Sequence, residues 1–340
     1  RVGHRSSAVK RRILLLGRTI GAYRVDAWVS ALRELGFDVV RALDTDDDAG
    51  IPAQAGERRR RIEARLRRRA AQLDAARLAI GASGIVVLPL NNGCIGTALH
   101  LRRWLRVPVV SDLYVSMYDT MVNDRALVAE WSEEARALRR MDRSLVESSD
   151  ALLTLGRTEF EHVVSLVDAR PDRRKVVVAP LSIPRRQRRT GPRRRTGPLN
   201  LAWWGSFIPL HGLDRMVAAL RILRERGVDP VMHAFGPDDP APVRSAFLDL
   251  VRTLPPGSIR LSSTETFQNG KLEPWLLERC DLALGIFGDS QKARHCVPNK
   301  VPDALSLELP VLTMRSPGIA EHLNEDELVL CENDPEAIAD

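Results

Sequence analysis

One stretch of the sequence, from Asp281 to Glu321, limits the possible folds more than any other. It begins with the apolar run Leu282–Ile286, which is typical of a strand buried on both faces of a parallel sheet. A helix is expected from Val301, because Pro302 suits a first helical turn. A second strand is expected at Leu309–Thr313. Strand, loop, helix and strand in this order predict a βαβ unit, and therefore an α/β fold with a parallel sheet.

The segment from Gln291 to Lys300 is expected to be a polar loop between that first strand and the helix. Such loops lie at the carboxyl ends of parallel strands, where ligands bind and helix N-termini present N–H groups to anions. Because this loop carries Lys292, His295 and Lys300, it indicates a site for a negatively charged ligand. A solvated basic loop without a ligand is the alternative, and polarity alone does not decide between them.

Two further strand–loop–helix patterns open the two halves of the chain. The apolar run Arg12–Leu16 leads into a loop with Gly17 and Gly21, and the run Leu199–Trp204 leads into the loop Gly205–Gly212. Glycines in such loops let the backbone approach a ligand or a second domain closely. A chain of 340 residues is long enough for two cores, so we expect two Rossmann-like domains.

Composition suggests the domain boundaries. We expect an N-terminal domain at residues 1–184, a basic linker at 185–198 and a C-terminal domain at 199–340. The linker combines proline and glycine with a dense run of arginines, which favours a solvated hinge.

The net charge of +7 raises the question of nucleic-acid binding. The arginines are spread widely and no nucleic-acid motif accompanies them, so we expect no nucleic-acid partner. The cysteines are isolated, which argues against a disulfide framework and against a structural zinc site. We expect a cytoplasmic protein without a bound metal. The four cysteines are Cys94, Cys280, Cys296 and Cys331.

The segment Glu57–Ile80 is strongly basic and has helical periodicity. Its arginines could lie on an anionic membrane surface, which would place the protein at the inner face of the membrane. The alternative, which we favour from the pattern, is a helix that packs on the core and exposes an arginine face. The apolar positions of the pattern are Ile62, Leu66, Ala70, Leu73 and Ile80.

Asp112 ends the apolar run Val107–Asp112, so it is expected at the carboxyl tip of a parallel strand. A carboxylate there could position an acceptor or transfer a proton. Capping the next helix is an equally ordinary role for an aspartate at this place.

Three strings together carry a resemblance to a known family. The first lies between Phe287 and Glu321, where the short motifs FG, S, KA, VPNK, DAL and LPV occur in this order and a glutamate follows. The second is GSFIPLHG at Gly205–Gly212, and the third is DLYVSMYDTMVNDR at Asp112–Arg125. The pattern resembles the retaining glycosyltransferases of family four, which have the GT-B fold of two Rossmann-like domains facing across a cleft. The resemblance implies that the helices closing this fold would follow Asp340.

The resemblance also implies site residues. The family often has two glutamates where this chain has His295 and Asp303, and arginine and lysine where it has Ser206 and His211. Residues placed at the donor by the resemblance are Gly205, Ser206, His211, Lys292, His295, Asn299, Lys300 and Asp303, and the glycine loop facing the cleft contains Gly17 and Gly21.

The implied reaction is sugar transfer from a nucleotide diphosphate sugar with retention of configuration and no metal. Lys292, His211 and Lys300 would stabilise the leaving diphosphate. The acceptor is open: a glycan, a lipid-linked molecule or a small molecule would each fit. Two other interpretations remain, a nucleotide-sugar epimerase of the same fold and a noncatalytic binding or scaffold protein.

Overall fold

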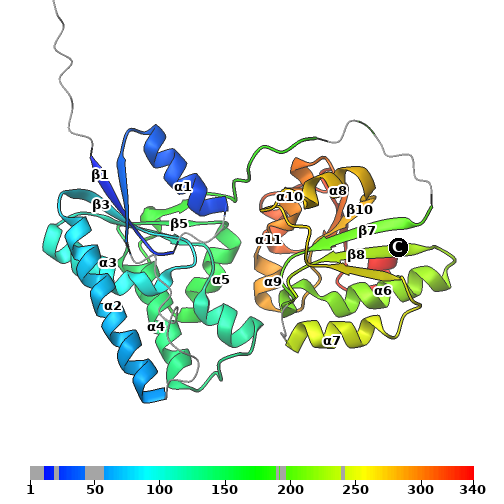
Figure 1. Ribbon diagram of the computed structural model, residues 1–340, viewed down its shortest axis with the longest axis horizontal. Coiled ribbons are helices and arrows are strands. Elements are labelled where there is room, and N and C mark those ends of the chain that lie inside the picture. The colour runs from blue at the N-terminus through cyan, green and yellow to red at the C-terminus, as the bar shows by residue number, and fades with distance from the viewer. Residues whose placement is uncertain (1–10, 19–22, 43–56, 189–190, 192–196, 239–241) are drawn as a thin grey trace, which may run out of the picture. The chain divides into compact units, whose positions relative to one another are not determined.

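The computed structural model describes residues 11–18, 23–42, 57–188, 191, 197–238 and 242–340. The described residues form two compact units (Figure 1). Unit 1 consists of the described residues within Arg1–Tyr118, Trp131–Thr154 and Val163–Ser182. Unit 2 consists of the described residues within Asp119–Glu130, Leu155–His162 and Ile183–Asp340. Unit 2 thus includes two short segments from the first half of the chain. The domain boundaries expected at 184 and 199 stay a prediction.

Unit 1 contains a six-stranded sheet in which every pair of neighbours is parallel, in the order β2-β1-β3-β4-β5-β6. Its strands are β1 Arg12–Leu16, β2 Asp38–Ala42, β3 Ala82–Val87, β4 Val109–Leu113, β5 Ala151–Thr154 and β6 Val176–Val178. The helices of the first half of the chain are α1 Tyr23–Glu34, α2 Glu57–Ala79, α3 Ile95–Leu105, α4 Glu133–Ser148 and α5 Arg157–Val167, with short 3-10 turns η1 Asn92–Cys94 and η3 Arg173–Lys175.

Unit 2 contains a second six-stranded parallel sheet, in the order β12-β11-β10-β7-β8-β9. Its strands are β7 Leu199–Trp204, β8 Pro230–Phe235, β9 Ile259–Ser262, β10 Leu282–Leu284, β11 Val311–Met314 and β12 Val329–Cys331. Its helices are α6 Leu213–Glu225, α7 Pro242–Val251, α8 Leu272–Arg279, α9 Gln291–His295, α10 Lys300–Ser306, α11 Pro317–Ala320 and α12 Pro335–Ala339, with a 3-10 turn η4 Pro209–His211 and a π-helix η2 Asp119–Asp124.

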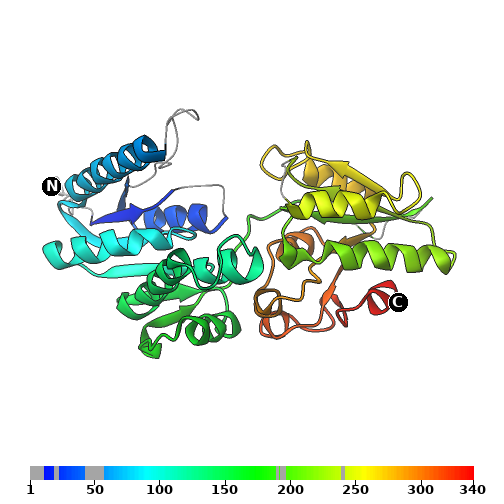
Figure 2. The same cartoon turned by 90° about the horizontal axis from the view of Figure 1, so that it is seen from below.

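The sheet of unit 2 separates two apolar cores, because successive side chains of a strand point to opposite faces. Trp203 packs into one core with residues of α6 and α7, and its neighbour Trp204 packs into the other with residues of α8 and α10. Figure 1 shows these helix pairs on the two faces, and the view from below in Figure 2 brings α6 and α7 to the front. The expected α/β class with two parallel-sheet domains is confirmed.

The segment Gln291–Lys300 differs from the expected loop, because it contains the helix α9 and the first residue of α10. Ser290 starts α9 by accepting a hydrogen bond from the N–H of Ala293 at 3.1 Å. Similarly, Ser316 starts α11 by accepting a hydrogen bond from the N–H of Ile319 at 3.3 Å. Serines that cap short helices look like turn residues in a sequence, so pattern analysis missed both helices.

Helix α2 faces the opposite way from the favoured expectation. Ala75 and Ala79 are fully buried, whereas Leu66, Leu73 and Ile80 are exposed. Small alanines let the helix approach the sheet closely, so the larger aliphatic side chains point outward. The expectation that these three residues pack on the core is therefore wrong, and Ala70 is exposed as well. The side chains of residues 57–65, including Ile62, lie outside the described residues.

At the start of the linker, the side chain of one residue, Arg186, is buried by contacts within unit 2, whereas Arg185, Gln187 and Arg188 are exposed. The side chain of Arg186 is only 7% exposed and pairs with Glu273 and Asp303. Residues 189–190 and 192–196 of the linker lie outside the described residues. In the part of the chain that the structure describes, no helix is both long and apolar enough to cross a membrane.

Candidate functional site

Loops from neighbouring strands meet at the carboxyl edge of the sheet of unit 2, where ligands bind in folds of this type. The loop after β7 and the loop after β10 touch through glycines, since a Cβ on Gly212 would lie 2.2 Å from the Phe287 carbonyl oxygen. A Cβ on Gly288 would lie 2.4 Å from the Leu210 carbonyl oxygen. Gly212 also has a φ of +60°, which glycine adopts without strain. Both glycines are therefore needed to bring the two loops together.

Lys300 and His211 form a buried pair between these loops. The ammonium of Lys300 donates a hydrogen bond to Nδ1 of His211 at 2.8 Å, and the two residues are 4% and 6% exposed. The ring of Trp203 lies beside them, with its centre 5.4 Å from the Lys300 nitrogen. Because Nδ1 of His211 accepts, its proton is on Nε2, and Nε2 faces Gly205, whose added Cβ would lie 3.3 Å away.

Burial controls the protonation of this pair. It lowers the pKa of Lys300 to about 7, although Cys296 and Asp303 act to raise it. Burial, with smaller contributions from Lys300 and Arg125, lowers the pKa of His211 well below its ordinary value. Among the described residues, no carboxylate lies within 4.0 Å of the Lys300 ammonium. A buried ammonium that forms no ion pair with a carboxylate favours an anionic ligand.

Two other predicted donor residues lie on the surface of the same loops. Ser206 is exposed directly after Gly205, and Asn299 is exposed directly before Lys300 at the start of α10. The carbonyl of Asn299 accepts a hydrogen bond from the Asp303 N–H at 3.0 Å. The structure thus brings Gly205, Ser206, His211, Asn299 and Lys300 to one edge of the sheet.

Asp303 has a different environment, because its carboxylate is bonded to the linker. Oδ1 of Asp303 accepts from Arg186 at 2.8 Å, and the same guanidinium donates to Glu273 at 3.2 Å. The guanidinium also stacks 3.8 Å from the centre of the Phe267 ring. No sequence pattern singles out Arg186, which is one of many arginines in its segment.

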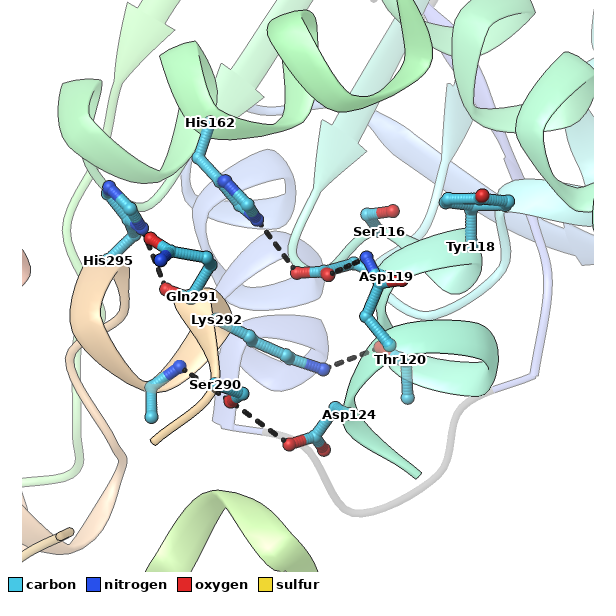
Figure 3. A network of polar contacts seen from close by, with 12 residues as sticks. Ser116, Tyr118, Asp119, Thr120, Asp124, His162, Ser290, Gln291, Lys292 and His295 are labelled. Atoms are coloured by element: carbon cyan, nitrogen blue, oxygen red, sulfur yellow. Dashed lines mark hydrogen bonds and ion pairs between the residues drawn. The ribbon is translucent and has the colours of Figure 1, made fainter. Parts of the chain in front are cut away.

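Lys292 bonds to the π-helix η2, as Figure 3 shows. Its ammonium donates to Oγ1 of Thr120 at 2.5 Å, and the neighbouring Ser290 donates to Oδ1 of Asp124 at 3.3 Å. Burial raises the pKa of Asp124, although Lys292 lowers it. Asp124 Oδ2 is buried and has no hydrogen-bond partner in the described part of the chain. The string Asp112–Arg125 had marked this segment, but pattern analysis did not single out Thr120 or Asp124.

His295 belongs to the same network (Figure 3). Its ring stacks on that of His162 with the centroids 4.7 Å apart, and its Nδ1 donates to the Gln291 carbonyl at 2.7 Å. Nε2 of His162 bonds to Asp119 at 3.1 Å. Burial raises the pKa of Asp119, but hydrogen bonds from His162 and Asn123 outweigh it and lower the pKa overall. His162 was not identified from the sequence, since a lone histidine in a helix carries no pattern.

Glu321 closes this side of unit 2. Its carboxylate accepts hydrogen bonds from the backbone N–H groups of Arg157 at 2.5 Å and Thr158 at 2.7 Å, at the start of α5. Burial raises the pKa of Glu321, but these hydrogen bonds lower it more. A carboxylate at a helix N-terminus also interacts favourably with the helix dipole.

Asp112 lies in unit 1, at the carboxyl end of β4, and is fully buried. Its Oδ2 accepts hydrogen bonds from Arg24 at 2.6 Å and from Trp28 at 2.7 Å. Burial raises its pKa, whereas Arg24 and Trp28 lower it. Within the described residues, Asp112 therefore bonds to side chains of α1 and not to the N–H groups of a helix N-terminus.

The glycine loop of unit 1 is described in part. Gly17 has a φ of +125°, and a Cβ there would lie 2.3 Å from the side chain of Asn91. Gly21 lies outside the described residues. No group of three or more histidine, cysteine or acidic side chains in the described residues could hold a metal ion. Burial raises the pKa of Cys296 to about 12, which makes it a packed thiol at neutral pH.

Comparison with known proteins identifies the fold. No model of a protein family matches the sequence, and a search of curated proteins finds no match. The structure is similar to a UDP-forming α,α-trehalose-phosphate synthase from Burkholderia xenovorans, with 12% identity, a TM-score of 0.64 and coverage of 97% of this chain and 90% of that chain. It is also similar to the lipopolysaccharide outer core galactosyltransferase WaaB, with 10% identity, a TM-score of 0.57 and coverage of 92% and 83%.

A third similar structure is described as a UDP-N-acetylglucosamine 2-epimerase from Listeria monocytogenes, with 14% identity, a TM-score of 0.53 and coverage of 97% and 86%. At such low identities these likenesses establish the fold and not the activity. The chain is an α/β protein with two Rossmann-like domains. More specifically, it has the GT-B fold, as the resemblance implied. Its membership of family four stays a prediction.

Proposed function

We propose that this protein is a glycosyltransferase that transfers a sugar from a nucleotide diphosphate sugar to a hydroxyl acceptor with retention of configuration. The observation that carries the proposal is the buried Lys300–His211 pair at the carboxyl edge of the sheet of unit 2. A diphosphate would form the direct ion pair that Lys300 does not form within the described residues. The GT-B fold supports the proposal, because similar structures include a galactosyltransferase and a trehalose-phosphate synthase.

The pair suits the departure of a diphosphate. In the proposed reaction the bond between the anomeric carbon and the β-phosphate oxygen breaks, and the acceptor hydroxyl oxygen bonds to the same carbon from the same face. The hydroxyl proton passes to the leaving phosphate oxygen. The Lys300 ammonium and the Nε2–H of His211 would stabilise the charge that develops on that oxygen. The absence of a side chain at Gly205 leaves room for phosphate beside His211 Nε2.

Nucleotide binding tests the first part of the proposal. UDP, GDP, TDP and ADP are titrated while the melting temperature is recorded, because a ligand at about 100 times its Kd adds roughly 2.7 kcal/mol of stability. Wild type should respond to one of the bases, and Lys300→Met should not. Lys271→Met is the matched control, since Lys271 is an exposed lysine of the same unit. Absence of a shift with every nucleotide would contradict the proposal.

Product analysis tests the second part. The nucleotide sugar that binds is incubated with candidate acceptors, and NMR determines the anomeric configuration of any product. Retained configuration supports the proposal, and inversion refutes that part of it. A changed sugar on the donor without acceptor would identify an epimerase, and binding without turnover would support a noncatalytic protein. Asp112 is proposed to act on the acceptor, so Asp112→Asn should lower turnover without weakening nucleotide binding.

A further inference from the structure

Helix α2 rests on unit 1 through a narrow face of small residues. Ala75 and Ala79 are fully buried, and the helix contacts β1, β2 and α3. Gln72 donates a hydrogen bond to Thr97 of α3 at 3.4 Å. This attachment orients the rest of the helix surface outward.

The outward face carries a row of aliphatic side chains. Leu66, Leu73 and Ile80 are 60%, 73% and 58% exposed. They follow one another at intervals of seven residues, or about two helical turns, so they lie along one line of roughly 20 Å. Single exposed leucines are ordinary, but Leu66 and Leu73 of α2 and Ile80, which directly follows the helix, form an exposed aliphatic row, and exposed apolar groups gathered in this way mark interaction sites. We call these three residues the α2 stripe.

Arginines flank the α2 stripe. Arg69 follows Leu66 by three residues and Arg77 follows Leu73 by four, so both lie on the face of the stripe. Arg77 is 76% exposed and contacts Asp74 at 3.2 Å. The helix as a whole contains nine arginines against three acidic residues. An aliphatic row with cationic borders therefore runs along the helix.

An arginine-lined groove lies at the same edge of the sheet as the end of the stripe. Ile80 precedes β3 and Arg106 precedes β4, and the two strands are neighbours in the sheet. The groove has a volume of about 620 Å³, and its lining includes Arg102, Arg103 and Arg106. Arg102 pairs with Asp150 at 2.9 Å. The guanidinium groups of Arg103 and Arg106 have no hydrogen-bond or ion-pair partner within the described residues.

The combination of aliphatic and cationic groups distinguishes among possible partners. A nucleic acid would pair with the arginines and leave the aliphatic row in water. An apolar protein surface would cover the row but leave the arginines without counter-charges. An anionic lipid surface satisfies both, because acyl chains accept the aliphatic groups while head-group phosphates bind the arginines, whose stems lie along the boundary.

We propose that the α2 stripe and the neighbouring arginine groove bind the surface of an anionic membrane. The inference is independent of the proposed glycosyltransferase activity, because it rests on unit 1 surface residues. The helix lies on the membrane plane, with Leu66, Leu73 and Ile80 at the acyl boundary and Arg69 and Arg77 at the phosphates.

Co-sedimentation with vesicles tests the proposal. Full-length protein is mixed with vesicles of phosphatidylcholine alone or of equal parts phosphatidylcholine and phosphatidylglycerol. Wild type should partition roughly tenfold or more in favour of the anionic vesicles, and added salt should reduce this partition. The triple variant Leu66→Gln, Leu73→Gln, Ile80→Gln should lose it. Leu35→Gln is the control, because Leu35 is also 73% exposed in unit 1.

A charge variant tests the cationic component. Arg77→Gln should weaken partition about fivefold, which corresponds to about 1 kcal/mol for one basic residue at a membrane surface. Arg252→Gln is its matched control, since Arg252 is 74% exposed and also pairs with an aspartate three residues earlier. Arg252 lies in unit 2, so its loss should leave partition unchanged.

Three results would overturn the proposal: equal binding to both vesicle types, wild-type partition by the triple variant, or a dimer that the triple variant dissociates while no vesicles bind. The last result would show that the stripe joins two copies of the chain. Light scattering measures the dimer, and circular dichroism confirms that the variants are folded. If the triple variant does not fold, the vesicle partition of the single variant Leu73→Gln is compared with that of wild type. An unchanged partition would refute the proposal.

Discussion

Raising the pH from 7 to 9 should weaken the binding of a nucleoside diphosphate. The reason is the buried ammonium of Lys300, because burial lowers its pKa to about 7. Two pH units above that value, about one hundredth of the free protein keeps the charge that binds phosphate. If only the charged form binds, the apparent Kd rises about 50-fold between pH 7 and pH 9, from about twice to about 100 times its value for the fully charged protein.

The other groups at this site should not titrate in the same interval. His211 stays neutral, because burial lowers its pKa well below the ordinary value. Burial raises the pKa of Cys296 to about 12, so its thiol stays protonated. The last phosphate proton of the ligand has a pKa of about 6, so the ligand charge is constant above pH 7. Binding at pH 8 to 9 should therefore take up close to one proton, which calorimetry in two buffers of different ionisation enthalpy measures.

The same group links stability to pH. Between the folded pKa of about 7 and the ordinary value of 10.5, the unfolded chain binds a proton that the folded chain does not. Stability of the free protein should therefore rise with pH across this interval, by an upper limit of about 5 kcal/mol. Lys300→Met should abolish both pH dependences, whereas Lys271→Met should keep them. A Kd that is constant from pH 7 to 9 in wild type would refute the reasoning.

Three further predictions concern the packing around the site. Gly212→Ala should lower the melting temperature more than Gly257→Ala, because both glycines have positive φ but only Gly212 lacks space for a Cβ; equal losses would contradict this. Arg186→Met should destabilise the protein by about 3–5 kcal/mol, because it removes the ion pair of a buried carboxylate, whereas exposed Arg188→Met should cost under about 1 kcal/mol; denaturant unfolding compares them. Because the pKa of Glu321 is lowered in the folded chain, its carboxylate stabilises the fold above the ordinary value of 4.5, and this stabilisation is lost as the pH falls through the folded pKa. Glu321→Gln should therefore flatten the acid limb of the melting-temperature profile, and an unchanged limb would exclude this role.

Part of the site was predictable because it depends on local sequence. The apolar runs at Leu199–Trp204 and Leu282–Ile286 predict buried parallel strands, and parallel strands place their following loops at one edge. His211 and Lys300 follow these runs, so their common edge could be expected. Their direct hydrogen bond and the lowered pKa of Lys300 could not, because both depend on how deeply the loops bury the two side chains.

The partners of charged side chains were decided by tertiary structure. Lys292 bonds to Thr120, which is 172 positions away in the chain, and Asp303 bonds to Arg186, which is 117 positions away. Any of the 51 basic residues could have been the partner of Asp303 as far as the sequence shows. Only the folded chain selects one, since ion pairing requires a contact within a few ångströms.

The sequence by itself determined the alternation of strands and helices, the parallel sheets and the glycines at close contacts, because periodicity and backbone conformation act within a few residues. The tertiary structure decided which face of a helix is outward. Leu66 and Leu73 have the spacing of core residues in α2, yet Ala75 and Ala79 occupy the contact with the sheet. Burial is a property of the space between elements, and its outcome depends on which residues allow the closest approach.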